Sequence, residues 1–99
     1  MRVRISRSAS EDLLNGHAFY ERQQSGIGDY FLDSLFADID ALMLYAGMQA
    51  KPESRLHRAM AKRFPFAIYY DLGDGLVTVV AVLDCRQNPA SIMARLKLQ

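Results

Sequence analysis

Residues 64–89 of the chain read FPFAIYYDLGDGLVTVVAVLDCRQNP, in which two apolar runs flank a short polar segment. The runs at 64–71 and 76–84 are rich in aromatic and β-branched side chains, which favour strands. The segment between them, 71–75, holds two glycines and two aspartates, residues that tolerate the positive φ of a tight turn. This pattern predicts two antiparallel neighbouring strands. The second is expected at the centre of a sheet because it is apolar on both faces.

Further elements are predicted on both sides of this hairpin. Asn88 and Pro89 are typical of a helix N-cap and first turn, so a short helix is expected to follow the second strand. Residues 55–62 form a weaker strand candidate before the hairpin. Residues 2–6 alternate polar and apolar side chains, as a half-buried strand does.

Two helices are predicted between the first strand and the weaker one. An apolar stripe at helical spacing covers residues 9–20, with Ser8 or Ser10 expected as the N-cap and an end near Gln24. Glycines at positions 26 and 28 then interrupt the helical pattern. A second stripe follows, and its positions expected in the core are Phe31, Leu35, Ile39 and Leu42.

The predicted order of elements is β-α-α-β-β-β-α, and the predicted fold class is α+β. We expect a helical hairpin packed on a mostly antiparallel four-stranded sheet, with a short C-terminal helix and with the helices on one sheet face. A length of 99 residues suits one compact domain, so residues 1–99 are expected to form a single domain.

The composition narrows the classes of function. The chain is 51% hydrophobic and 23% charged, which indicates a folded domain and not a disordered one. Its longest apolar run is too short to cross a bilayer, and its basic N-terminus lacks the apolar stretch of a secretory signal. The single cysteine, Cys85, excludes an internal disulfide. These features predict a cytoplasmic protein with no membrane partner.

Charge is unevenly divided although the net charge is only +1. The first 50 residues hold 4 basic and 7 acidic side chains, and the remainder holds 8 basic and 4 acidic ones. Five cations crowd one short stretch, namely Lys51, Arg55, Arg58, Lys62 and Arg63. A solvated connector and a surface for an acidic partner both fit this stretch. A free-standing nucleic-acid-binding domain usually carries a larger positive charge, so direct DNA binding is not expected.

No metal, no cofactor and no complete catalytic set are predicted. The two histidines, His17 and His57, lie in different predicted elements and lack the spacing of a metal site. Metal-free RNA cleavage needs a base, an acid and cations, and only His57 is an obvious acid or base near the cations Arg58 and Arg86. Residues 88–99 contain no His, Tyr, Asp or Glu, so this catalytic set is incomplete.

Several short sequences, taken in order, resemble the ParE/RelE toxin superfamily of type II toxin–antitoxin and plasmid-stabilisation systems. They are FPFAIYY at 64–70, VAVLDCRQNP at 80–89, Ser8-Ala9 with Asp12-Leu13, Tyr20-Glu21, and residues 26–31 ahead of the second helix. The resemblance spans nearly the whole chain. It implies a small bacterial toxin that is neutralised by a cognate antitoxin protein, whose C-terminal segment wraps around the toxin.

The superfamily carries two mechanisms on one scaffold, so the fold alone does not choose between them. RelE-like members cut mRNA in the ribosomal A site and resemble one another in a strongly basic face and a C-terminal Tyr or His, both deficient here. ParE-like members inhibit DNA gyrase without a catalytic site of their own, and this near-neutral chain with its plain tail is more similar to them. The resemblance therefore implies a gyrase inhibitor without catalytic residues. The alternative is a ribosome-dependent mRNA endonuclease that uses His57, Arg58 and Arg86.

Two binding surfaces follow from the resemblance. The residues expected to be exposed for target binding are Arg86, Arg95 and Lys97. The residues expected to meet acidic side chains of the antitoxin are Arg55, Arg58, Lys62 and Arg63. A third interpretation is a non-toxic or decayed member that acts only in antitoxin binding. DNA would then be contacted only indirectly, through the antitoxin.

Overall fold

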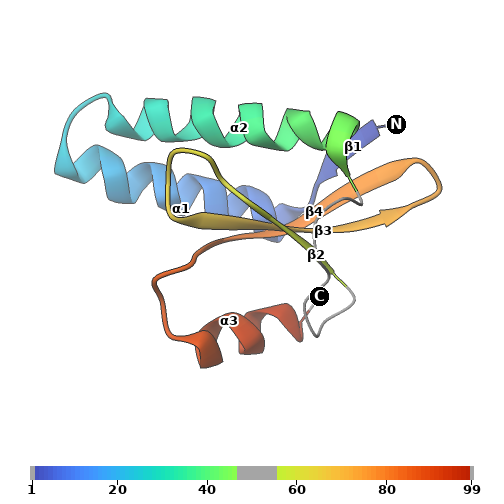
Figure 1. Cartoon of the computed structure of the whole chain (residues 1–99). Helices are drawn as coiled ribbons and strands as arrows, with labels where there is room; N and C mark the ends of the chain where they lie inside the picture. The colour runs from blue at the N-terminus through green and yellow to red at the C-terminus, as the bar shows by residue number, and fades with distance from the viewer. Residues whose placement is uncertain (1, 47–55, 99) are drawn as a thin grey trace.

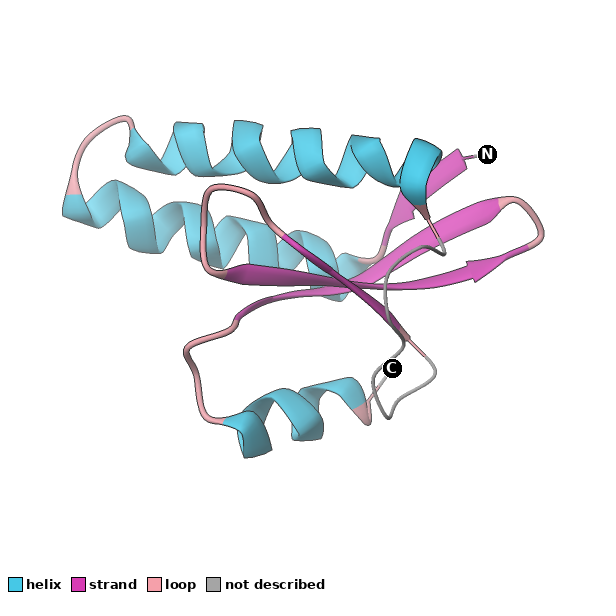
Figure 2. Ribbon diagram, in the orientation of Figure 1, coloured by secondary structure: helices cyan, strands magenta, loops and turns pink. Residues whose placement is uncertain are grey.

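The computed structural model describes residues 2–46 and 56–98. The elements are β1 (Arg2–Ile5), α1 (Arg7–Gln23), α2 (Ile27–Tyr45), β2 (His57–Met60), β3 (Phe66–Gly73), β4 (Leu76–Asp84) and α3 (Pro89–Leu96). Figure 2 shows these helices and strands. The predicted order and the α+β class are confirmed.

The four strands form one sheet in the order β1-β4-β3-β2. β1 runs parallel to β4, and the other two pairs are antiparallel. Asp74 and Gly75 both take positive φ, at 55° and 72°, as the two central residues of the tight β3–β4 turn. The predicted hairpin is therefore confirmed, and its second strand lies inside the sheet as expected.

The helices lie on both faces of the sheet, not on one face as predicted. α1 and α2 cover one face and α3 covers the other (Figure 1). The reason lies in β4, which is apolar on both faces: Val79 and Val82 pack under the hairpin, whereas Ala81 and Leu83 pack with Leu96 of α3. A strand buried on both faces needs a cover on each of them.

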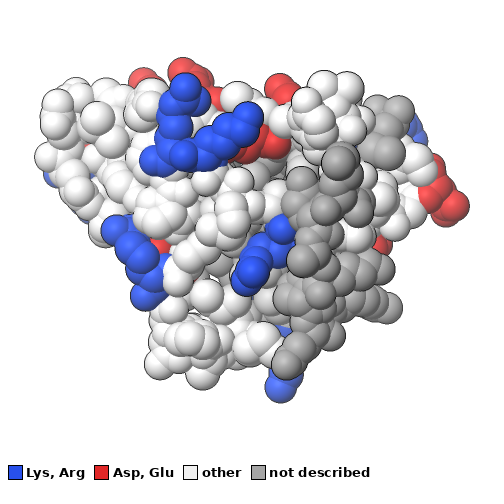
Figure 3. Space-filling model, viewed as in Figure 1, with Lys and Arg blue, Asp and Glu red and all other residues white. Residues whose placement is uncertain are grey.

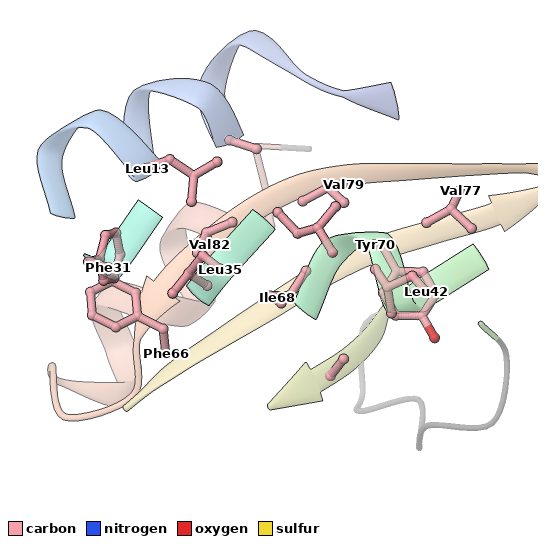
Figure 4. Close-up of a cluster of buried hydrophobic side chains, with 13 residues drawn as sticks. Leu13, Phe31, Leu35, Leu42, Phe66, Ile68, Tyr70, Val77, Val79 and Val82 are labelled. Atoms are coloured by element: carbon pink, nitrogen blue, oxygen red, sulfur yellow. The ribbon is translucent and has the colours of Figure 1, made fainter. Parts of the chain in front are cut away.

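The larger core fills the space between the helical hairpin and the sheet (Figure 4). The four α2 positions predicted for the core are all buried there, with exposures of 2% or less. Their packing partners from the sheet include Ile68, Tyr70 and Val77, which are fully buried. Both Tyr69 and Tyr70 are buried, one on each face, so neither is available to a surface site.

The first helix begins earlier than predicted. Its N-cap is Ser6, not Ser8 or Ser10, and the Ser6 hydroxyl accepts a hydrogen bond from the Ala9 N–H at 3.1 Å. Ser6 takes this place because β1 ends at Ile5 and the chain turns directly into α1. The hydroxyls of Ser6 and Ser8 both donate to the Val80 carbonyl, at 3.5 and 3.2 Å, so they also tie the start of α1 to β4.

The two helices of the hairpin approach closely because glycines remove side chains at their contact. A Cβ added at Gly16 would lie 2.5 Å from the Phe31 ring, and one at Gly28 would lie 2.7 Å from the His17 carbonyl oxygen. The start of α2 has no side-chain cap of its own. The Glu21 carboxylate supplies one, since it accepts from the N–H groups of Gly26 and Gly28.

We expect Gly16→Ala to destabilise the fold. The added methyl group must displace the buried Phe31 ring, and overpacking of this kind costs about 1–3 kcal/mol, more than the ~1 kcal/mol gained from helix propensity. The matched control is Gly73→Ala, where a Cβ meets nothing within 4 Å. Urea denaturation of both variants checks this, and equal midpoints would show that the helices do not pack as described.

Candidate functional site

The alternative catalytic set of His57, Arg58 and Arg86 is not brought together. His57 opens β2 and stacks on Tyr70, with ring centroids 5.1 Å apart, on the sheet face that the hairpin covers. Arg58 is the next residue and therefore points to the opposite face. Arg86 follows β4, whose last residue pairs with Phe66, four positions along β3 from Tyr70 and about 13 Å away. His57 thus lies far from Arg86.

Arg86 contacts Asp84 and Tyr20. Its Nε and terminal nitrogen donate to the two Asp84 carboxylate oxygens at 3.0 and 2.7 Å. The same terminal nitrogen lies 3.5 Å from the Tyr20 hydroxyl. The hydrogen bond from Arg86 holds the pKa of Asp84 below its usual value, and Asp84 in turn raises the pKa of Arg86. The Arg86 charge is exposed but already compensated by a carboxylate.

Sequence reasoning missed Tyr20 and Asp84 as neighbours of Arg86. Tyr20 occupies the last position of the apolar stripe on α1, and that position predicts a core residue. Its ring does pack there, 5.2 Å from Phe31 and 4.9 Å from Phe64, while its hydroxyl reaches the surface group. The sequence did offer a signal for the carboxylate partner. Asp84 ends the predicted strand 76–84 and lies only two residues before Arg86.

The expected exposure of Arg95 is wrong, because its side chain is paired with Asp12 and partly buried. Its two terminal nitrogens each donate to Asp12 at 2.7 Å, and the two side chains are 25% and 10% exposed. One Asp12 oxygen also accepts from the Val82 N–H at 2.9 Å. Asp12 therefore joins α1 to β4 and α3, and Arg95 holds α3 against the sheet. Lys97, at the end of α3, is exposed as predicted.

The cations predicted for antitoxin binding gather beside the edge strand β2. Arg58 lies on β2, and Lys62 and Arg63 lie on the loop to β3; all three are exposed. Arg55 lies outside the described residues. Figure 3 shows Lys and Arg side chains spread over this face, with Asp and Glu mostly toward its rim. The Lys62 N–H donates to Asp38 of α2 at 3.0 Å, which fixes the loop against the helix.

A groove of about 280 Å³ runs between the C-terminal half of α2 and β2. Its lining residues are Asp38, Ala41, Leu42, Tyr45, Ala59, Met60, Lys62 and Ile68. Two large apolar residues at its rim, Tyr45 and Met60, are about half exposed, at 52% and 55%. The groove therefore combines apolar walls with one cation, Lys62, and one carboxylate, Asp38.

A second groove, of about 320 Å³, lies between α1 and the end of β4. The Asp12–Arg95 pair forms part of its wall, together with Phe19 and Gln87. Its charged groups are paired within the fold, so it offers no free charge to a ligand.

Cys85 is exposed but is not an activated thiol. Burial of the sulfur raises its pKa, and the nearby positive charge of Arg58 opposes that shift only in part. Among the described residues, no cluster of three or more His, Cys, Asp or Glu side chains could hold a metal ion. His17 instead contacts Asp29 of α2 at 3.0 Å. None of the described helices is long and apolar enough to cross a membrane.

No protein-family model matches the chain, and no curated protein matches its sequence. A solved structure does match: a chain of the chromosomal ParDE TA system from P. aeruginosa, with a TM-score of 0.73 at 15% identity. The match covers 83% of this chain and 92% of that one. The two chains share one fold. The ParE-like α+β architecture expected from the sequence is therefore established, while the activity is a separate question.

We expect Asp12→Ala to lower the free energy of unfolding by about 2–3 kcal/mol, because it leaves the partly buried Arg95 charge and the Val82 N–H without their acceptor. The control is Asp84→Ala, which breaks the more exposed pair with Arg86 and should cost clearly less, because water screens that pair. Chemical denaturation measures both values. Equal losses would contradict a structural role specific to Asp12.

Proposed function

We propose that this chain is the toxin of a type II toxin–antitoxin system and that it inhibits DNA gyrase in the ParE-like manner. The observation that carries the proposal is the fold shared with the ParDE chain over 83% of the sequence. Both the antitoxin that neutralises it and its gyrase target belong to the cytoplasm, where we place the protein.

The chemistry around Arg86 supports gyrase inhibition over RNA cleavage. A cation that stabilises a phosphoryl transition state must be available to the phosphate, and Arg86 is engaged by both oxygens of Asp84. Its contact with the Tyr20 hydroxyl is long, at 3.5 Å, and the Tyr20 ring is packed among core aromatics. His57 pairs with Tyr70, about 13 Å along β3 from the residue that pairs with the end of β4. We therefore assign no catalytic residue.

The target-binding surface in this proposal consists of Arg86 and Lys97, with α3 between them. Arg95 contributes by holding α3 in place through Asp12. The antitoxin-binding surface consists of Arg58, Lys62 and Arg63, to which the sequence adds Arg55. DNA contacts belong to the antitoxin, so the purified toxin alone should not shift promoter DNA.

The direct test is to induce the chain without an antitoxin and to follow DNA and protein synthesis by pulse labelling. We expect DNA synthesis to fall first. If protein synthesis falls first, the chain acts as a ribosome-dependent nuclease and the gyrase proposal is wrong. If growth continues with both syntheses intact, the chain is a non-toxic member that acts only in antitoxin binding.

A charge reversal tests the target surface in the same assay. We expect Lys97→Glu to reduce toxicity at least about tenfold in the inducer needed for arrest, because a long-range attraction becomes a repulsion. Arg22→Glu, the same change at an exposed residue near the end of α1, serves as the control and should leave toxicity unchanged. Equal toxicity of the two variants would remove Lys97 from the target surface.

A further inference from the structure

The last residues of β4 direct backbone groups toward α1. The Val82 N–H donates to Asp12 of α1 at 2.9 Å, so the Val82 C=O points to the same side of the strand. Asp84, two residues further along, has the same orientation. Phe66, its partner on β3, uses its own N–H and C=O in other hydrogen bonds, so the Asp84 N–H is not bonded to it.

The Val82 C=O and the Asp84 N–H have no hydrogen-bond partner within residues 2–46 and 56–98. β1 pairs with β4 only as far as Val79, and the side chains of α1 reach only the Val82 N–H on this stretch. A main-chain acceptor and a main-chain donor therefore lie side by side in the wall of the groove between α1 and the end of β4. Both groups can form hydrogen bonds with a ligand that enters the groove.

The rest of this groove has the composition of a small-ligand site. Phe19, Phe66 and Leu83 provide apolar walls, and the exposed amide side chains of Asn15 and Gln87 lie among its lining residues. Its volume of about 320 Å³ falls at the lower end of the roughly 300–1,000 Å³ that such sites occupy. Sites of this class combine apolar walls with a few polar groups that orient the ligand.

The charges and the hydrogen-bonding groups select the ligand. The carboxylates of Asp12 and Asp84 are each paired with an arginine of the fold, so the groove suits a neutral ligand. A nucleobase is neutral and flat, and it presents a donor next to an acceptor. Adenine does so on two edges, through N6–H with N1 and through N6–H with N7, and asparagine and glutamine amides bond the second edge in a bidentate manner.

We propose that the groove between α1 and the end of β4 binds an adenine base. The adenine N6–H donates to the Val82 C=O, and N1 accepts from the Asp84 N–H. The ring lies beside Phe19, and the amides of Asn15 and Gln87 are available to the N7 edge. This site does not depend on the proposed toxin function, because it rests on the groove alone.

The test titrates adenosine into the isotope-labelled full chain and follows the backbone amides by NMR. We expect saturable shifts of the Val82 and Asp84 amide resonances. 1-Deazaadenosine, which lacks the N1 acceptor, and purine riboside, which lacks the amino group, should each bind at least about fivefold more weakly, because each leaves a backbone group unpaired. The control ligand is 5′-deoxyadenosine, which keeps the base intact and should bind within about twofold of adenosine.

A pair of variants tests the ring contact. Phe19→Ala should weaken adenosine binding by at least about fivefold, because it removes an apolar wall of the groove. Phe36→Ala is the control, since Phe36 lies on α2 outside the groove and is almost equally exposed, at 42% against 44%. If the Phe19 variant is unfolded by circular dichroism, the analogue series decides alone, because it changes only the ligand.

An oligonucleotide of four deoxyadenosines distinguishes the two sources of the base. Tighter binding of adenosine supports a free nucleoside as the ligand, and tighter binding of the oligonucleotide supports an adenine within a single strand. Three results overturn the inference: no saturable shift at Val82 and Asp84, equal binding of 1-deazaadenosine and adenosine, or equal binding of uridine and adenosine. None of these measurements depends on toxicity, so failure of the adenine site leaves the proposed function untouched.

Discussion

The carboxylate of Asp12 is the contact on which the arrangement of the molecule depends. Both oxygens are engaged by Arg95 of α3, and one of them also accepts from the Val82 N–H of β4. One side chain thus joins α1 to β4 and α3, which lie 70 and 83 residues further along the sequence. The pair is largely shielded from water, so loss of one partner leaves a charge that the fold cannot hydrate well.

The need for this contact arises from the shortness of β1. That strand ends at Ile5, opposite Val79, and a register shift in the β3–β4 pairing lies just beyond. Among the described residues, no strand pairs with the rest of this β4 edge. Side chains at the start of α1 satisfy it instead: the Ser6 and Ser8 hydroxyls at the Val80 carbonyl, and Asp12 at the Val82 N–H. On this side of the sheet, side chains of α1 therefore take the place that a longer β1 would hold.

The sequence predicted the elements well because their signals are local. Apolar periodicity, the turn at 71–75 and the Asn88-Pro89 start of α3 depend on neighbours in the chain, and each was confirmed. The site was predicted less well because its contacts are not local. Asp12 and Arg95 are 83 residues apart. Taken singly, Asp12 is typical of an acid at a helix start and Arg95 of a solvated cation, so neither predicts the ion pair. The sequence could have predicted that the side chains of His57 and Arg58 point to opposite faces of the sheet, since adjacent strand residues do so.

In the proposed function, a ParE-like fold with a neutralised Arg86 acts on gyrase and not on RNA. The measurement that tests it most directly adds the purified chain to purified DNA gyrase with relaxed plasmid, beside a parallel reaction with translating ribosomes and mRNA. We predict that supercoiling stops at near-stoichiometric amounts of the chain while the mRNA stays intact. Unimpaired supercoiling with mRNA cut on the ribosome would contradict the account.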